Sequence, residues 1–274
     1  MSEARARGLP CSGVARSGTD HAVDATDAQA LRALICDTAP ALIVNCVAVT
    51  NHAACEEQPA LAFLVNARTP ALLAHLCCET GARLVHISSD HLFSGDGSAP
   101  HDETARVSLL NEYARTKYAG ERLALTDPSA LVIRTNIVGL RCWPDRPTFA
   151  EWALDAIESA RPLTLFDDFF TSSMHTRACA AGVLDLVDTG ARGLVNVASS
   201  QVSSKREFMQ ALAHAVGADL HDVEAGSVRE LVPRRAESLG LDVTRAQRLL
   251  DRRLPDLTDT VAAIVAESRD RLAA

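Results

Sequence analysis

A tyrosine and a lysine four residues apart are the side chains in this sequence best suited to chemistry. Tyr113 and Lys117 lie in a stretch, residues 110–125, whose apolar pattern predicts a helix, and positions i and i+4 share one face of a helix. An ammonium beside a phenol stabilises the phenolate, so we expect Lys117 to lower the pKa of Tyr113 from its ordinary value of about 10. A tyrosine tuned in this way donates or accepts a proton near neutral pH.

A polar cluster precedes this helix. The apolar run 83–88 predicts a buried strand, and Ser88, Ser89 and Asp90 stand at its end. The carboxyl ends of parallel strands are where α/β sheets place their active sites. A serine hydroxyl at this edge is able to hydrogen-bond the same substrate oxygen as Tyr113. The order of strand, polar cluster, glycine-containing loop and Y-x-x-x-K helix therefore predicts one site.

Short apolar runs alternate with longer amphipathic stretches, which is typical of a parallel sheet covered by helices on both faces. The predicted strands are 41–47, 83–88, 130–134 and 194–197. The predicted helices are 27–37, 57–80, 110–125, 149–160, 175–188, 203–216 and 258–273, and Ser203 or Ser204 with Glu207 fits a capping box. The pattern predicts a doubly wound α/β domain over residues 1–135, to which 175–197 return, and a small C-terminal subdomain over 136–174 and 198–274.

Composition excludes several classes of protein. Apolar residues make up 47% of the 274 residues, enough to exclude disorder as the main state. The net charge is 27 − 35 = −8, which argues against a nucleic-acid partner. No apolar run approaches the ~18–20 residues of a membrane helix, and the N-terminus lacks the apolar core of a secretory signal. We therefore expect a soluble cytoplasmic protein with no membrane partner.

The eight cysteines and nine histidines do not form a recognisable metal or disulfide pattern. No pair of cysteines has C-x-x-C spacing, and no H-E-x-x-H motif is present. A cytosolic chain of this size does not need disulfides. We expect buried or half-buried free thiols and no bound metal.

Several stretches resemble, in the same order along the chain, the extended short-chain dehydrogenase/reductase superfamily and, within it, the dTDP-4-dehydrorhamnose reductase family. They are VNCVAVTNHAACEEQPALAFLVNA (44–67), ARLVHISSDHLFSGD (82–96), NEYARTKYAGE (111–121), LVIRTNIVG (131–139), RPLTLFDDFFTSS (161–173) and RRAESLGLDVTR (234–245). The resemblance implies a Rossmann-like sheet with a small substrate-binding subdomain. It also implies reduction of the 4-keto group of a nucleotide-activated 6-deoxysugar.

The resemblance assigns catalytic roles to three residues. Tyr113 would protonate the sugar C4 oxygen, Lys117 would lower the pKa of that tyrosine and hydrogen-bond the nicotinamide ribose, and Ser89 would orient the carbonyl. The hydride would come from the nicotinamide, so the difficult chemistry belongs to the cofactor.

Further residues are implied as binding residues. The cofactor set comprises Tyr113 and Lys117 together with Arg16, Asp24, Asn45, Cys46, Val47, Ala48 and Thr50. The substrate set comprises Ser88, Asp90, His91, Thr135, Asn136 and Arg235, with Arg134 preceding it on the strand. For Arg235 and Asp242 a salt bridge or a helix cap is an equal alternative to ligand contact.

The largest departure from the family pattern is at the front of the chain. Family members begin with a strand and a G-x-x-G-x-x-G turn that brings a pyrophosphate to a helix N-terminus. Here Gly8, Gly13 and Gly18 are spaced five apart, residues 1–8 match the end of the first helix, and 10–17 match the second strand. We expect the first strand to be absent, which leaves a gap in the sheet. A misassigned start and a true truncation with poor cofactor binding are both open.

Two smaller departures concern substrate and cofactor choice. The family's D-Q-x-G-x-P-T loop is here Asp167-Asp168-Phe-Phe-Thr-Ser172-Ser173, which puts substrate choice in doubt. His91 stands where the family usually has an aromatic or small residue.

Arg16 follows the predicted second strand, where a basic residue accommodates the 2′-phosphate of NADP. NADP(H) is therefore expected, with NAD(H) as the alternative.

The motifs leave other functions open. An epimerase or dehydratase of the same superfamily uses the same Tyr/Lys pair, and a non-catalytic regulatory subunit would fit the absent glycine turn. A serine hydrolase is disfavoured because no G-x-S-x-G turn is present. The sequence predicts a sugar-nucleotide ligand and leaves open whether the chain forms a homodimer.

Overall fold

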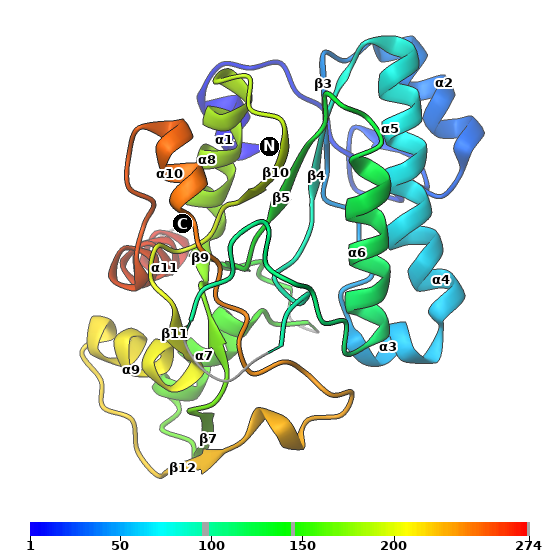
Figure 1. Cartoon of the computed structure of the whole chain (residues 1–274). Helices are drawn as coiled ribbons and strands as arrows, with labels where there is room; N and C mark the ends of the chain where they lie inside the picture. Colours follow the sequence, from blue (N-terminus) through cyan, green and yellow to red (C-terminus); the bar gives the residue numbers. More distant parts are fainter. Residues whose placement is uncertain (95–98, 144–145, 273–274) are drawn as a thin grey trace. The chain divides into compact units, whose positions relative to one another are not determined.

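The computed structural model describes residues 1–94, 99–143 and 146–272, which form two compact units (Figure 1). Unit 1 comprises Met1–Leu92, Leu109–Arg134 and Val183–Val195. Unit 2 comprises Phe93–Ser108, Thr135–Gly182 and Asn196–Ala274.

Unit 1 contains a four-stranded sheet in the order β10-β5-β4-β3. Its strands are β3 (Leu42–Asn45), β4 (Arg83–Ile87), β5 (Leu131–Arg134) and β10 (Gly193–Asn196). β4 pairs in parallel with both β3 and β5, and all four residues of β5 are buried. The four strands occur where the apolar runs predict them. β3 is one of the two edge strands of this sheet, and Val44 on it is 43% exposed.

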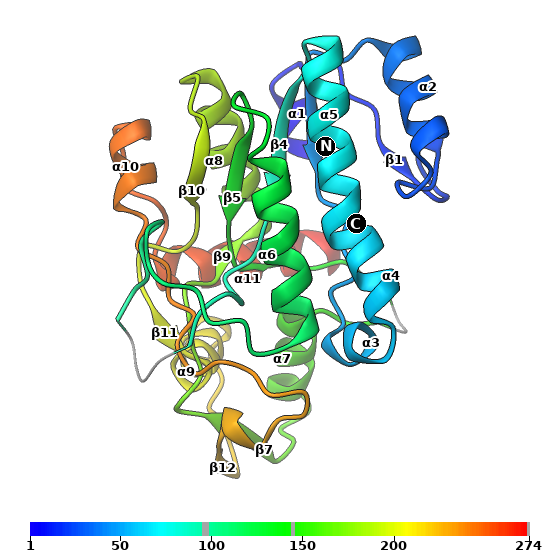
Figure 2. The same cartoon turned by 45° about the vertical axis from the view of Figure 1, so that its right-hand side comes forward.

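The helices of unit 1 include α1 (Ser2–Ala6), α2 (Ala28–Thr38), α3 (His52–Glu57), α4 (Pro59–Phe63), α5 (Thr69–Thr80) and α6 (Glu112–Ala124). Two of them, α5 and α6, pack against β4. Figure 2 shows α5 and α6 side by side in front of β4 and β5. Their apolar residues join a core in which Leu73, Leu84 and Val132 are buried.

The prediction of one continuous helix over residues 57–80 is wrong, because the regular helix is interrupted in its middle. The structure has α3, α4, a π-helical turn η1 (Leu64–Arg68) and α5 in succession. Pro59 and Pro70 each stand in the first turn of a new helix, where the missing N–H costs nothing. Widened turns of this kind often occur at functional sites.

The predicted strand over residues 10–17 is mostly irregular. Only β1 (Val14–Ala15) is extended, and it pairs in parallel with β2 (His21–Ala22). This pair is separate from the four-stranded sheet. The described strands of unit 1 therefore fall into two sheets.

One helical stretch, Pro59–Thr80, is by length and composition able to cross a membrane. The prediction that no such stretch exists is therefore wrong. Half of its most apolar window is buried in the fold, and Leu73 and Leu76 belong to the core of unit 1. Core helices of soluble proteins are also found to be long and apolar enough to cross a membrane.

Unit 2 is built on three helices and short strand pairs. The helices α7 (Phe149–Glu158), α9 (Lys205–Val216) and α11 (Leu257–Leu272) share a core with Phe208, Leu212 and Ile264. The strand pairs are β6 (Ile137–Val138) with β9 (Met174–His175), β7 (Leu163–Phe166) with β12 (Val223–Gly226), and β8 (Phe170–Thr171) with β11 (Ser203–Ser204). The remaining helices are α10 (Thr244–Leu250) and the 3₁₀ turn η2 (Val228–Glu230), and α8 (Thr176–Asp188) passes from unit 2 into unit 1.

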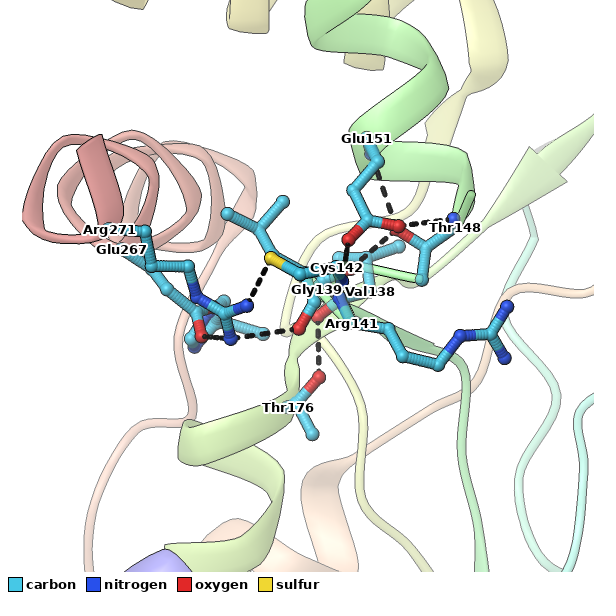
Figure 3. Close-up of polar contacts among 11 residues, drawn as sticks. Val138, Gly139, Arg141, Cys142, Thr148, Glu151, Thr176, Glu267 and Arg271 are labelled. Carbon is cyan, nitrogen blue, oxygen red and sulfur yellow. Dashed lines mark hydrogen bonds and ion pairs between the residues drawn. The ribbon is translucent and has the colours of Figure 1, made fainter. Parts of the chain in front are cut away.

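Side-chain caps fix the helix starts of unit 2. The predicted capping box is present at α9, where Ser204 and Glu207 bond each other's backbone N–H groups. A second box joins Thr148 and Glu151 at α7. Figure 3 shows the Glu151 carboxylate also accepting the backbone N–H of Cys142. These caps anchor the preceding loop to α7.

All eight cysteines are free, and the prediction of buried or half-buried thiols is wrong for half of them. The exposed ones are Cys36, Cys46, Cys78 and Cys142. Cys142 is held at the surface of unit 2 by the Arg271 guanidinium, which also donates to the Leu140 carbonyl at 3.0 Å (Figure 3).

Candidate active site

Unit 1 brings together two of the predicted catalytic side chains. Tyr113 lies in the first turn of α6, which Asn111 caps by accepting the N–H of Ala114 at 2.8 Å. Ser89 follows β4, and its side chain lies near the Tyr113 phenol, whose pKa it lowers. Both are nearly buried, with exposed fractions of 4% for Ser89 and 8% for Tyr113. The pair forms because β4 ends beside the start of α6.

The predicted lowering of the Tyr113 pKa by Lys117 is wrong for this structure. Burial raises the pKa of Tyr113 to about 12, the nearby Ser89 side chain partly opposes this rise, and the Asp90 carboxylate raises the pKa further. A buried phenol without an adjacent cation loses solvation when it ionises. Tyr113 is therefore a protonated phenol at neutral pH, suited to donating a proton.

Lys117 lies one turn further along α6, and its cation is directed to the sheet. Its Nζ donates to the carbonyl of Ile87, the last residue of β4, at 2.7 Å. Burial lowers the pKa of Lys117 to about 8, partly opposed by Cys46 and Glu121. The ammonium is thus placed at the carboxyl end of β4.

A buried ion pair joins α6 to β5 directly behind this site. Arg134 makes a two-point contact with Glu121 at 2.9 and 2.7 Å, and both side chains are almost fully buried. Ser88 donates to the same carboxylate at 3.0 Å. The hydroxyl of Ser88, predicted to contact substrate, is therefore engaged inside the protein. This network orients α6 and was not foreseen as a unit.

The π-helical turn η1 supplies a second anchor for α6. Asn66 is fully buried and accepts from the backbone N–H of Val49 at 2.7 Å. Its amide donates to the Val49 carbonyl and to the Thr116 hydroxyl, each at 3.1 Å. The carbonyl of Asn66 lies so close to Gly120 that an added Cβ would stand 1.9 Å from it. One side chain thus links the loop after β3 to the helix that carries Tyr113 and Lys117.

The predicted cofactor residues of β3 lie together at its carboxyl end. Asn45 is buried, accepts from the Val47 N–H at 3.0 Å and contacts Nδ1 of His86 at 3.1 Å. The Nε2 atom of His86 is buried and has no hydrogen-bond partner among the described residues. Beyond Asn45 the chain turns outward: Ala48 is half-buried, and the exposed residues are Cys46, Val47 and Thr50.

Arg16 and Asp24 follow the short strands β1 and β2. Both side chains are exposed. Asp24 accepts from the backbone N–H and the hydroxyl of Thr26, which with the nearby Arg16 lowers the pKa of its carboxyl. Arg16 directly follows β1, as the sequence predicts for a residue that recognises the cofactor.

Two histidines lie against Tyr113. The ring of His52 is 4.7 Å from the Tyr113 ring and the ring of His91 is 5.7 Å from it, centroid to centroid. Asp90, the other predicted substrate residue here, is buried beside them. The sequence analysis singled out His91 and missed His52. The signal that was available is that both histidines follow the carboxyl ends of predicted neighbouring strands.

The other predicted substrate residues belong to unit 2. Thr135 is buried and contacts the Cys179 thiol at 3.6 Å, while Asn136 accepts from the Ser173 hydroxyl at 2.8 Å. Arg235 is half-buried, and its Nε has no hydrogen-bond partner among the described residues. Burial lowers the pKa of this guanidinium. An unpaired half-buried cation of this kind favours an anionic ligand.

Asp242 and Asp168 have structural partners in unit 2. Asp242 accepts from the Thr244 N–H at 2.7 Å at the start of α10, which is the helix-cap alternative that the sequence left open. Asp168 accepts from the Val228 N–H at 2.9 Å, so the altered loop is tied to η2.

Comparison with known proteins gives the family. Residues 3–269 match the RmlD substrate binding domain family. The chain belongs to this family. It is 31% identical over 270 residues to the dTDP-4-dehydrorhamnose reductase of Mycolicibacterium smegmatis, with 92% of this chain and 79% of that protein covered. It is 29% identical to the probable low-salt glycan biosynthesis reductase of Haloferax volcanii, with 91% and 85% covered.

Solved structures agree on the fold of this RmlD-family member. The dTDP-4-dehydrorhamnose reductase of Clostridium acetobutylicum superposes with a TM-score of 0.81 at 24% identity, covering 90% of this chain and 88% of that one. The Bacillus anthracis dTDP-4-dehydrorhamnose reductase in complex with NADP gives 0.81 at 21%, covering 90% and 87%. The predictions of the family and of a Rossmann-like α/β fold are confirmed.

Proposed function

We propose that this chain reduces the 4-keto group of a nucleotide-activated 6-deoxysugar with NADPH, as its relatives named dTDP-4-dehydrorhamnose reductase do. The observation that carries the proposal is the buried Ser89–Tyr113 pair at the end of β4, with Lys117 one helical turn away. A regulatory subunit has no chemical need for a buried phenol held in this way.

The residues divide the proton work among them. Tyr113 is protonated at neutral pH because its pKa is about 12, and its hydroxyl gives a proton to the C4 oxygen as that oxygen gains charge. The Ser89 hydroxyl hydrogen-bonds the same substrate oxygen and orients the carbonyl. The Lys117 ammonium, fixed on the Ile87 carbonyl, contributes positive charge at the end of β4.

The residues around β3 fit the nicotinamide half of NADPH. Val47 and Thr50 are exposed after the strand end, and the orphaned Nε2 of His86 leaves a polar group for a bound molecule to satisfy. Lys117 would hold the ribose, and bound NADPH supplies the hydride. The printed sequence contains no G-x-x-G-x-x-G turn for the pyrophosphate, so cofactor affinity is measured as part of the test.

The two units suggest a division of binding roles. Unit 1 carries Arg16, Asn45 and Lys117 for the cofactor, and unit 2 carries Arg235 for the diphosphate of the substrate. The protein is proposed to act in the cytoplasm, without a membrane or nucleic-acid partner. The burial of half of the apolar window in Pro59–Thr80 and the net charge of −8 support this. Sedimentation decides between a monomer and a homodimer.

The test is NADPH oxidation by the full chain with a dTDP-4-keto-6-deoxysugar. Stoichiometric consumption of NADPH is expected, whereas turnover without net oxidation would indicate an epimerase. Tyr113→Phe should lower kcat by about 10²–10⁴-fold, the usual contribution of a general acid. Tyr118→Phe is the matched control, because Tyr118 is the other tyrosine of the chain and lies on the same helix. Equal loss in both variants would refute the assignment of the acid.

A further inference from the structure

We propose that His52 and His91 form a hydrogen-bonded imidazole pair that positions Tyr113, and that the pair holds only while it carries at most one extra proton. The inference rests on the proposed role of Tyr113 as proton donor. It adds two positioning residues, and with them a limit on the acid side of the reaction.

The geometry of the pair is specific. Nε2 of His52 lies 3.3 Å from Nδ1 of His91, and the two rings are 4.8 Å apart at an interplanar angle of 58°. Both rings contact Tyr113, His52 from a tilted orientation and His91 edge-on. The three rings therefore form one packed cluster, and a shift in either imidazole changes the position of the phenol.

The elements on either side fix the pair. His52 is the first residue of α3, which Asn51 caps by accepting the Ala54 N–H at 2.9 Å. His91 is tied to the catalytic strand end, because its backbone N–H donates to the Ser89 hydroxyl at 3.1 Å. The Ser89 side chain also lies near Tyr113 and lowers its pKa, so His91 is connected to the phenol through its ring and through Ser89.

Proton bookkeeping on the two facing nitrogens gives the pH dependence. Two neutral imidazoles share one N–H between Nε2 of His52 and Nδ1 of His91, since one ring donates and the other accepts. One added proton leaves a donor and an acceptor and strengthens the bond by charge. A second added proton makes both nitrogens donors, and the bond breaks.

Charged groups on the neighbouring elements favour addition of the first proton to the imidazole pair. They therefore help to keep the hydrogen bond between the two imidazoles at neutral pH. Asp90 Oδ1 lies 3.9 Å from Nε2 of His91, and a carboxylate at this distance stabilises an imidazolium. On α3, His52 and Glu56 share a face at i and i+4. The other titratable groups on α3 and α6 are those of Cys55, Glu57, Glu112, Tyr113, Arg115, Lys117, Tyr118, Glu121 and Arg122.

The first experiment measures kcat against pH for the full chain and two variants. His52→Gln keeps an amide near the place of Nε2 and His91→Asn keeps one near the place of Nδ1, and neither side chain titrates. Wild type should lose about tenfold in kcat for each pH unit below the second protonation. Each variant should retain activity within about threefold of its own neutral value over that range. His75→Gln is the control, because His75 is exposed on α5 and pairs with Glu79.

A second measurement does not depend on turnover. In the cofactor-free full chain carrying Tyr118→Phe, Tyr113 is the remaining tyrosine, so its ring resonances are identified without ambiguity. These resonances should shift together with the imidazole nitrogens of His52 and His91 at the second protonation, and the shift should vanish with His52→Gln.

The outcomes separate this proposal from the proposed function. Independent titration of the two histidines, or variants that keep the acid-side loss of the wild type, would overturn the pair. A linked titration in a chain that turns over no keto sugar supports the pair and removes the reductase assignment.

Discussion

At the scale of single residues, environment decides what Tyr113 and Lys117 do. Spacing alone predicts a phenol with a lowered pKa, but the structure buries the phenol and directs the ammonium to the Ile87 carbonyl. Their pKa values therefore move apart, to about 12 for Tyr113 and about 8 for Lys117. Burial disfavours the charged form of each group, so one environment makes the phenol a weaker acid and the ammonium a stronger one.

The Lys117 value predicts an alkaline limit for the reaction. The free protein holds the ammonium below a pH of about 8 and loses it above, so kcat/KM should fall as the pH rises through that value. Lys117→Arg keeps a cation over the whole range and should lack this alkaline limb, although its rate at neutral pH is lower. An unchanged limb in that variant would assign the titration to another group.

The same shift affects stability. The folded pKa of about 8 lies below the ordinary lysine pKa of 10.5, so the folded chain binds fewer protons than the unfolded chain between these values. The contribution of Lys117 to the free energy of unfolding should therefore rise from pH 8 to 10.5. Urea unfolding of the wild type and of Lys117→Met measures the difference, and a difference that falls over this range would contradict the assignment.

At the scale of elements, α6 is the part that the rest of unit 1 holds in place. The four strands of the main sheet and the capping box of α9 follow local pattern, and the sequence predicts them. The π-helical turn does not follow local pattern, because Asn66 adopts it to bond Val49 and Thr116 in other elements. The same holds for His52, whose role depends on where α3 begins relative to β4.

The buried ion pair of α6 predicts a large and asymmetric effect on stability. Glu121→Gln leaves the Arg134 cation buried without its counter-charge and should lower the free energy of unfolding by about 3–5 kcal/mol. The double variant Glu121→Leu with Arg134→Met removes both charges and should lose less than Glu121→Gln alone. Urea unfolding measures both, and a loss below about 1 kcal/mol for Glu121→Gln would contradict the role of the pair.

Gly120 gives a second prediction for the same helix. A Cβ at this position would stand 1.9 Å from the Asn66 carbonyl oxygen, so Gly120→Ala must push η1 and α6 apart. The expected loss is about 1–3 kcal/mol, the usual cost of overpacking, despite the better helix propensity of alanine. The control is Ala119→Gly, which removes a methyl group next to it, and the same unfolding assay compares them.

At the scale of the whole molecule, the two units carry different predicted ligands. The chain visits unit 1 three times, and the cofactor candidates lie on its first and second passes. The family resemblance predicted this division. No sequence pattern shows that the Nε of Arg235 has no hydrogen-bond partner among the described residues. That feature depends on the burial that unit 2 creates around it.

This division predicts a double dissociation of binding effects. Arg16→Glu should weaken NADPH binding by about tenfold or more and reduce the preference for NADPH over NADH. The KM of the sugar nucleotide should change little. Arg235→Met should raise the KM of the sugar nucleotide by a similar factor and leave the Kd of NADPH unchanged. Arg5→Glu and Arg234→Met are neighbouring controls, and a variant that shifts both ligands equally would argue against the division.

The anchoring of α6 has a consequence for engineering. This helix carries the proposed proton donor and the ammonium, and Asn66, Ser88 and Arg134 hold it through contacts that tolerate neither a shift along its axis nor a rotation. Libraries that aim at a new sugar should therefore leave residues 111–124 untouched and place diversity in the loops of unit 2. Conversely, α6 with its three partners is the minimal set to transfer when the same proton-donating geometry is grafted onto another parallel sheet.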